Sequence, residues 1–393
     1  MRKNKVKTLK IQPKDFSGRA YFPGTEDHPF HTINSLDKYT SVLPAFLYPL
    51  IFAGLLYLFT GDWVRSLIYF GFILTDLLIL TLLPRLRVSF GPPTLPMIFL
   101  AIFRFPFMLL GLPHAIVFQA LGALMVIYGF IIEPQRPKVE RYSITKCQNG
   151  KPGVIKIVHI SDLHMEYLTR NDERVIRTIN NLGPDLILFT GDFFNLSNQH
   201  DEQTNRDIVH FFNHLPPSSK IFAVTGSPAV DTGESLDWIL PQMNIHLLKN
   251  ELNTLDFQGN SINIYGLTCS HRPGEDSLRL QTLLQDSPPG GDVNILLYHS
   301  PDLAPEISGF NLDLQLSGHT HGGQIQFPFI GPIFAASLYG LAFTNGHYLV
   351  NDKLNLIVSR GLGLEGSAAP RVRFFSPPEI GLITLEFLPD NVQ

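Results

Sequence analysis

The stretch IKIVHISDLH, residues 155–164, decides the fold. Its first part, Ile155–Ile160, is rich in β-branched apolar residues and predicts a buried strand. The strand runs directly into Asp162 and His164, a carboxylate and an imidazole that can converge on one cation. One such pair is weak evidence for a metal site, so its value depends on the residues at the ends of the other predicted strands.

Three further predicted strands end in side chains of the same kind. They cover residues 185–190, 293–298 and 312–316, and they are followed by Asp192, by His299, and by His319 and His321. Sites in α/β folds gather at the carboxyl ends of strands, so we expect these side chains to lie together. A single histidine in such a place is usually structural, but four strand ends with metal-ligand side chains favour a metal site.

The second two-thirds of the chain alternates short apolar runs with amphipathic helical stretches. Further runs lie at residues 220–224 and 262–267, and apolar side chains recur at helical spacing before Gly183-Pro184. Strands that are nearly continuous apolar runs are typical of sheets covered by helices on both faces. Residues 153–388 are therefore predicted to form an α/β (α+β) domain.

The first third of the chain has a different composition. Four apolar stretches, residues 43–59, 64–83, 95–112 and 115–132, each approach the ~20 residues that a membrane-spanning helix needs. We therefore expect a four-helix transmembrane region at residues 42–133, after a tail (1–41) and before a proline-containing linker (134–152). The alternative, buried helices of a soluble protein, requires four nearly uncharged core segments in succession.

Basic residues flank this apolar region. They lie before the first stretch, among them Lys5, Lys7 and Lys10, and after the fourth, among them Arg136 and Lys138. By the positive-inside rule both ends of the region are expected in the cytoplasm. Because about forty mostly polar residues precede the first stretch, a cleaved signal peptide is not expected. The sequence thus predicts a multi-pass protein of the cell (inner) membrane with its α/β domain in the cytoplasm.

Two charged residues interrupt the apolar stretches, Asp76 in the second and Arg104 in the third. Both lie at a similar distance from the turn between these stretches, so an antiparallel helix pair brings them to the same depth. An ion pair that neutralises both charges is the expected arrangement. A role in binding a substrate or a lipid headgroup is the alternative.

Composition excludes two other classes of site. A formal net charge of -4 and a pI near 6.4 give no basic surface for nucleic acid. Cys147 and Cys269 are far apart in the sequence, so neither a disulfide framework nor a thiolate metal site is expected.

The order of these motifs, from Asp162-Leu163-His164 to Gly318-His319-Thr320-His321, resembles the calcineurin-like metallophosphoesterases. The run from Gly318 to Gln324 is similar to their membrane-associated bacterial branch, which includes phospholipid phosphodiesterases and UDP-2,3-diacylglucosamine pyrophosphatases. This resemblance covers residues 154–387 and implies a four-layer αββα sandwich. It also implies a dinuclear metal site at one end of the two sheets.

By the same resemblance, Asp162, His164 and His321 hold one divalent metal ion, His299 and His319 hold the other, and Asp192 bridges both. A metal-bound water is the implied nucleophile, and no further residue is assigned to the chemistry. Oxygen and imidazole ligands suit manganese, iron and zinc about equally, so the metals are not specified.

The chain departs from the family after the third strand. The family has Gly-Asn-His there, whereas this chain has Gly226-Ser227-Pro228. A serine hydroxyl is a poorer metal ligand than the amide, and proline cannot replace the histidine that assists the leaving group. Asp231 is a possible substitute, although an aspartate at this position is more often the cap of a helix beginning near Glu234.

These features together predict a membrane-bound metal-dependent phosphoesterase that hydrolyses a phosphodiester or pyrophosphate bond. A lipid membrane as partner makes a phosphorylated, lipid-linked substrate the expected class. Because Ser227 and Pro228 depart from the family, a weakened or inactive metal-binding sensor or scaffold is the alternative. A transporter with a regulatory domain is a third hypothesis, which rests on Asp76 and Arg104 alone.

Overall fold

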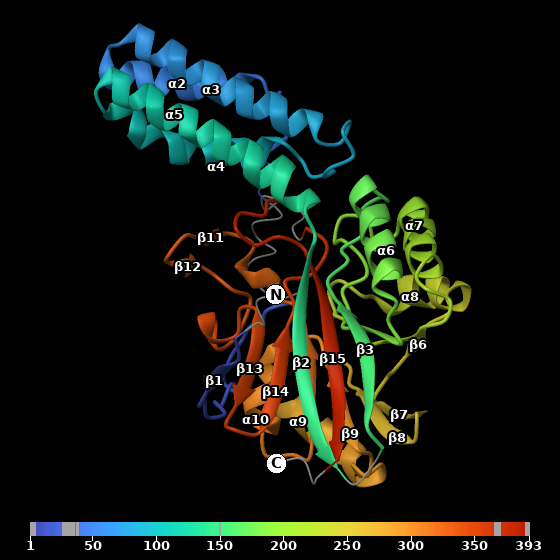
Figure 1. Ribbon diagram of the computed structural model, residues 1–393. Coiled ribbons are helices and arrows are strands. Elements are labelled where there is room, and N and C mark those ends of the chain that lie inside the picture. The colour runs from blue at the N-terminus through green and yellow to red at the C-terminus, as the bar shows by residue number, and fades with distance from the viewer. Residues whose placement is uncertain (1–4, 26–35, 37–38, 149–150, 365–370, 390–393) are drawn as a thin grey trace. The chain divides into compact units, whose positions relative to one another are not determined.

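The computed structural model describes residues 5–25, 36, 39–148, 151–364 and 371–389. The chain forms two compact units, both discontinuous in sequence. The first contains residues 1–28, 137–363 and 375–393, and the second contains residues 29–136 and 364–374. Figure 1 shows that the first holds the sheets and the second the long apolar helices.

A six-stranded sheet forms one half of the first unit. Its strand order is β2 (Lys138–Gln148), β15 (Glu379–Pro389), β3 (Gly153–Ile160), β4 (Leu186–Phe189), β5 (Lys220–Ala223) and β6 (His246–Leu247). Strands β3, β4 and β5 are parallel, so their carboxyl ends lie at one edge. Helices α6 (Arg170–Leu182), α7 (Glu202–Asn213) and α8 (Gly233–Ile239) lie on one side of this sheet (Figure 1).

A seven-stranded sheet forms the other half. Its order is β1 (Lys7–Leu9), β13 (Gly346–Val350), β14 (Leu354–Val358), β10 (Leu314–Ser317), β9 (Val293–Leu297), β8 (Asn260–Gly266) and β7 (Glu251–Phe257). Helices α9 (Pro273–Asp286) and α10 (Ala304–Ile307) pack on this sheet. A short pair, β11 (Gln326–Phe327) with β12 (Gly331–Pro332), stands apart from both sheets.

Three apolar cores show how the layers stack. Strand β4 illustrates this, because Ile187 and Phe189 face the helices α6 to α8 while Leu186 and Leu188 face the other sheet. The third core lies between the seven-stranded sheet and α9. The order is therefore helices, sheet, sheet, helices, and a strand buried on both faces is apolar at every position, as the sequence predicted.

Local sequence explains where the elements begin and end. Helix α6 starts with a capping box, in which the Thr169 hydroxyl accepts from the Asp172 backbone while the Asp172 side chain accepts from the Thr169 backbone. It ends at Gly183, which adopts a left-handed conformation. The six strands predicted in this domain are all found, each within two residues of its predicted bounds.

Two segments differ from the sequence prediction. The predicted linker, residues 134–152, contains β2, which pairs in parallel with β15 along its whole length. The predicted tail, residues 1–41, contains β1, which pairs in parallel with β13 and so joins the seven-stranded sheet. Neither segment has an apolar run, and both lie at the outer edge of a sheet, where charged residues are common.

The second unit contains helices at the four apolar stretches. These are α2 (Leu47–Thr60), α3 (Trp63–Leu82), α4 (Thr94–Arg104), which continues as a 3-10 turn to Leu109, and α5 (Leu112–Ile127), which continues to Gln135. Within the described part of the chain, the segments Trp63–Leu82 and Leu112–Gln135 are long and apolar enough to cross a membrane. The other two are shorter, so two of the four predicted spans meet the length and composition that a crossing needs.

Inside this unit the expected ion pair is present. The Arg104 guanidinium donates from Nε to Asp76 Oδ2 at 2.6 Å and from Nη2 to Asp76 Oδ1 at 2.8 Å. Gln119 completes the group, because Arg104 Nη1 donates to its side-chain oxygen at 3.0 Å. All three residues are buried. The predicted pairing of Asp76 with Arg104 is confirmed, and a buried amide joins it.

Candidate metal centre

All six predicted ligands come together at the carboxyl ends of the strands. Two overlapping groups have their ligand atoms within 4.8 Å of one another: Asp162, His164 and His321 form the first, and Asp162, Asp192 and His299 form the second. His319 lies beside them in a third group, with His299 and His271. Every one of these residues is buried. The predicted convergence of the strand ends is therefore confirmed.

The loops that carry these residues have an unusual backbone. Positive φ angles occur at Asp162, His164, Asp192, His271, His319 and His321. Such angles are uncommon for residues with a Cβ, and they cluster at functional sites. Hydrogen bonds between loops hold this conformation, as from the Asp162 amide to the Gly191 carbonyl (2.9 Å) and from the His164 amide to the Asp192 carbonyl (3.1 Å).

Two glycines allow the loops to approach one another. Gly191 has φ +93°, and a Cβ there would overlap the backbone of Gly226. A Cβ at Gly318 would overlap the carboxylate of Asp162. Each glycine thus lets a ligand-bearing loop touch its neighbour.

Hydrogen bonds to main-chain carbonyls fix the orientation of two histidine rings. His299 donates from Nδ1 to the Thr190 carbonyl (2.7 Å), and His164 donates from Nδ1 to the Phe194 carbonyl (3.0 Å). This turns the Nε2 atoms into the site, where they lie 3.2 and 3.4 Å from Asp192 Oδ2. This second layer of hydrogen bonds is typical of histidines that bind metals.

The site also contains a buried nitrogen with nothing to bind. His319 Nε2 has no hydrogen-bond partner among the described residues. A buried polar atom without a partner is costly, and native structures seldom leave one unless an ion or water fills the place. The donor set of carboxylates and imidazoles thus fits divalent metal ions.

Electrostatics inside the site are dominated by burial and by the contact between Asp192 and His299. Burial alone lowers the pKa of His299, but the charge and hydrogen bond of Asp192 raise it to about 10. Burial would raise the pKa of Asp192, yet the neighbouring His299 holds it well below its usual range. Burial also keeps His319 neutral by lowering its pKa. A proton on His299 must leave before that ring can bind a metal.

Both residues of uncertain role lie at this site. Ser227 donates from its backbone amide to Asp192 Oδ1 (2.6 Å), and its hydroxyl lies 3.3 Å from His299 Nε2. Asp231 accepts from the backbone amides of Gly226 (2.7 Å), Asp192 (2.9 Å) and Phe193 (2.8 Å).

The expected capping role of Asp231 is wrong. The residue before α8 is Thr232, and no side chain caps this helix. The carboxylate of Asp231 instead joins the loop after β4 to the loop after β5. It holds the backbone of Asp192 in place.

His271 was missed by the sequence analysis. It follows β8 and precedes α9, and its ring lies among those of His299 and His319. A strand was predicted at residues 262–267, but no ligand was predicted in the segment that follows it. A histidine four residues beyond a predicted strand end, just before the helix start at Pro273, was the available indication.

Comparisons with known proteins agree with this geometry. Residues 155–323 match the model of the calcineurin-like phosphoesterase family. The chain is 33% identical over 266 residues to the uncharacterized metallophosphoesterase YkuE of Bacillus subtilis, covering 66% of this chain and 89% of that protein. It is 30% identical over 289 residues to the UDP-2,3-diacylglucosamine pyrophosphatase LpxG of Chlamydia trachomatis, covering 60% and 84%. The chain therefore belongs to the calcineurin-like metallophosphoesterases, a family of phosphoesterase hydrolases.

Proposed function

We propose that this protein is a membrane-bound, metal-dependent phosphoesterase that hydrolyses a phosphodiester or pyrophosphate bond in a lipid-linked substrate. One observation carries the catalytic part of the proposal. Six buried carboxylate and imidazole side chains from four strand ends converge, in a chain that belongs to a phosphoesterase family.

The proposed ligand assignment combines the three groups at the site with the family pattern. Asp162, His164 and His321 would hold one metal ion, His299 and His319 would hold the second, and Asp192 would contribute to both. The position of Asp192 Oδ2, within 3.4 Å of Nε2 in both His164 and His299, supports the bridging role. When bound, two divalent ions (manganese, iron or zinc) polarise phosphoryl oxygens and supply a nucleophile at neutral pH.

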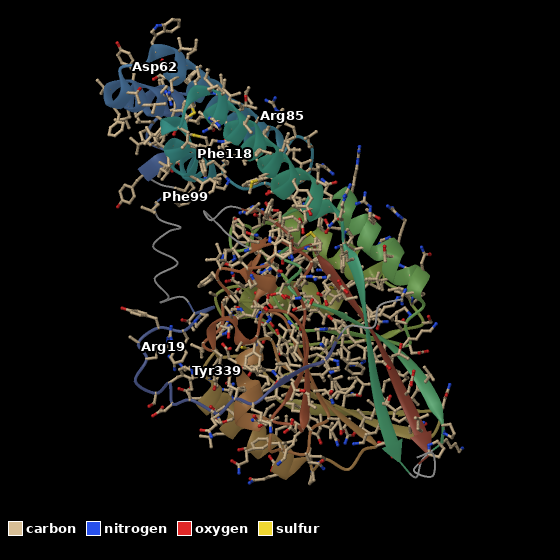
Figure 2. All side chains as sticks on the ribbon, turned by 60° about the vertical axis from the view of Figure 1, so that its left-hand side comes forward. Arg19, Asp62, Arg85, Phe99, Phe118 and Tyr339 are labelled. Atoms are coloured by element: carbon tan, nitrogen blue, oxygen red, sulfur yellow. The ribbon has the colours of Figure 1, made fainter. Side chains whose placement is uncertain are left out.

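The apolar surface of the second unit supports a membrane location. Large side chains are exposed along its helices, among them Leu58 (81%), Phe59 (71%) and Trp63 (68%). Phe99 and Phe118, labelled in Figure 2, belong to the same set. Soluble proteins rarely expose so many apolar side chains on one group of helices, whereas lipid-facing helices do.

Chain connectivity supports an even number of crossings. Residues before the helices pair with the first unit through β1 and β13, and residues after the helices enter it at β2. Both flanks of the helical region therefore lie on the same side of any membrane that it crosses. With basic residues on those flanks, we propose four spans and a cytoplasmic catalytic domain in the inner membrane.

The proposed substrate class rests on this membrane location and on the relatives. The chlamydial relative is named for a pyrophosphatase activity on UDP-2,3-diacylglucosamine, a phosphorylated compound with two acyl groups. A membrane-anchored site meets such amphiphilic compounds at the bilayer surface. The net charge of -4 does not favour nucleic acid.

The test uses the full chain, purified in detergent and loaded in turn with manganese, iron and zinc. Hydrolysis is measured on a bis-aryl phosphate, on a phospholipid and on UDP-2,3-diacylglucosamine. Asp192→Ala should lose more activity than the about 10- to 100-fold that the loss of an outer-shell partner costs. Full activity in this variant contradicts the proposed mechanism, and turnover of the aryl phosphate alone contradicts the lipid assignment.

Ser227 and Pro228 favour a second candidate function, a sensor or scaffold that binds a phosphorylated ligand with little turnover. The double replacement Ser227→Asn with Pro228→His separates the two. A weakened enzyme gains turnover from the restored side chains. If both forms bind inorganic phosphate but neither hydrolyses any of the three substrates, the sensor is the better interpretation.

A further inference from the structure

His271 occupies the corner of the metal site that the third strand leaves incomplete. Its ring centroid lies 4.4 Å from that of His319 and 5.9 Å from that of His299. One ring nitrogen from each of the three histidines falls within 4.8 Å of the other two. This spacing allows three imidazoles to bind one ion.

Ser227 marks where the missing ligand would stand. Its hydroxyl lies 3.1 Å from His271 Nε2 and 3.3 Å from His299 Nε2. Serine has a shorter side chain than asparagine, and the imidazole of His271 extends to its hydroxyl. The family has an amide ligand at the position of Ser227, and this chain has none there. The loop after β8 instead brings a nitrogen of His271 next to Ser227.

The loop around His271 is built to hold the ring there. His271 has a positive φ of 60°, and the φ angles of Asp162, Asp192 and His319 are also positive. Its neighbour Ser270 donates from both its amide and its hydroxyl to the carboxylate of Asp276, each at 2.9 Å. On the other side, Gly24 lies so close that a Cβ there would overlap His271 Nε2.

His271 also has a buried nitrogen without a partner. The residue is 2% exposed, and its Nδ1 has no hydrogen-bond partner among the described residues. A neutral imidazole has one donor and one acceptor nitrogen, and burial without a partner costs free energy. A metal ion bound by this ring would relieve that cost.

We propose that His271 is a ligand of the second metal ion and replaces the amide that the third strand lacks. The inference rests on the dinuclear site proposed above and adds a residue to it. The second ion is then held by three imidazoles and the bridging Asp192. Because imidazole replaces a hard oxygen ligand, the second position should prefer zinc or ferrous iron to manganese.

Metal stoichiometry tests this inference without measuring turnover. The full chain in detergent is stripped with a chelator, reloaded with zinc, and analysed by mass spectrometry for bound metal. We expect two ions in the native protein, one in His271→Ala, and two in the control His347→Ala, which removes a buried histidine of β13. Two ions in His271→Ala, with unchanged affinity, overturn the proposal.

The role of Ser227 is tested in the same assay. If His271 is the ligand, Ser227→Ala keeps two ions, and Ser227→Asn with His271→Ala regains the second ion. The regained site should bind manganese better relative to zinc than the native site does. Loss of the second ion in Ser227→Ala but not in His271→Ala overturns the proposal, because the hydroxyl would then be the ligand.

Cobalt spectroscopy shows whether a loss of metal in His271→Ala comes from misfolding. The visible absorption of Co²⁺ at the second position depends on its ligands, so His271→Ala should change that part of the spectrum and leave the first ion's bands in place. An unchanged two-ion spectrum overturns the assignment. If the native protein binds no metal at all, the dinuclear site itself fails, and this result is distinct from retention of two ions by the variant.

Discussion

At Asp231 one carboxylate accepts three backbone amides from two loops, and two of those amides belong to Asp192 and Phe193. Asp231→Asn replaces one acceptor oxygen with an amide that cannot accept, so at least one of the three hydrogen bonds is lost. We expect an about 10- to 100-fold loss of metal affinity or activity, as for other residues that orient metal ligands. Calorimetric metal titration measures it, and Asp237→Asn, exposed on α8, is the control that should bind normally.

The second prediction at the scale of single residues concerns Gly24. Its φ is +80°, and a Cβ there would overlap the ring of His271. Gly24→Ala should therefore displace His271 and weaken binding of the second metal ion while sparing the first. Gly340→Ala is the matched control, because its φ is also positive (+63°) and nothing lies near a Cβ at that position. Equal metal stoichiometry in the two variants would show that Gly24 does not support the ring.

Individual site residues were predictable from sequence where they follow an apolar strand closely or share a motif with a residue that does, as His164 and His321 do. Asp162, Asp192 and His299 lie just beyond buried strands, so their convergence could be inferred from topology. His271 lies five residues beyond β8, and its position depends on the Asp276 hydrogen bonds and on Gly24. Gly24 is far from His271 in the sequence, so its contact with the ring could not be inferred from the residues around His271.

The ion pair between α3 and α4 yields a prediction at the scale of elements. Arg104→Met leaves the Asp76 carboxylate buried and unpaired, which costs about 3–5 kcal/mol in comparable cases. Asp76→Leu with Arg104→Met removes both charges and should be less destabilising than the single change. Thermal unfolding in detergent measures the difference. A single variant as stable as the native protein would mean that the pair does not hold the helices together.

Most of the strands that the sequence did not predict lie at the edges of the sheets. The strand β2 contains charged residues at Lys138, Glu140 and Arg141, and it was assigned to a linker. It becomes a strand because β15, far away in the sequence, pairs with it. Central strands such as β4 and β9 are buried at every position, and their apolar runs are sufficient to identify them.

For the whole molecule, we expect bound metal to stabilise the first unit. Buried Asp162 and Asp192 repel each other, and a ligand that binds only the folded state adds about 2.7 kcal/mol at one hundred times its dissociation constant. A chelator should therefore lower the melting temperature, and added zinc should raise it in a concentration-dependent way. In Asp192→Ala the response should be smaller. If the melting temperature of the native protein does not change when metal is removed or added, the proposed site is contradicted.

The parallel pairing of β1 with β13 joins Lys7 to Tyr348. During synthesis at about 5–20 residues per second, the first strand waits on the order of tens of seconds for its partner. The apolar helices of residues 47–127 leave the ribosome within that interval. With the proposed membrane location, insertion of these helices would come first, and the segment that brings Gly24 to His271 would dock only after β13 has been made. On this order of events, the proposed metal site would be completed only after the proposed spans have reached the bilayer.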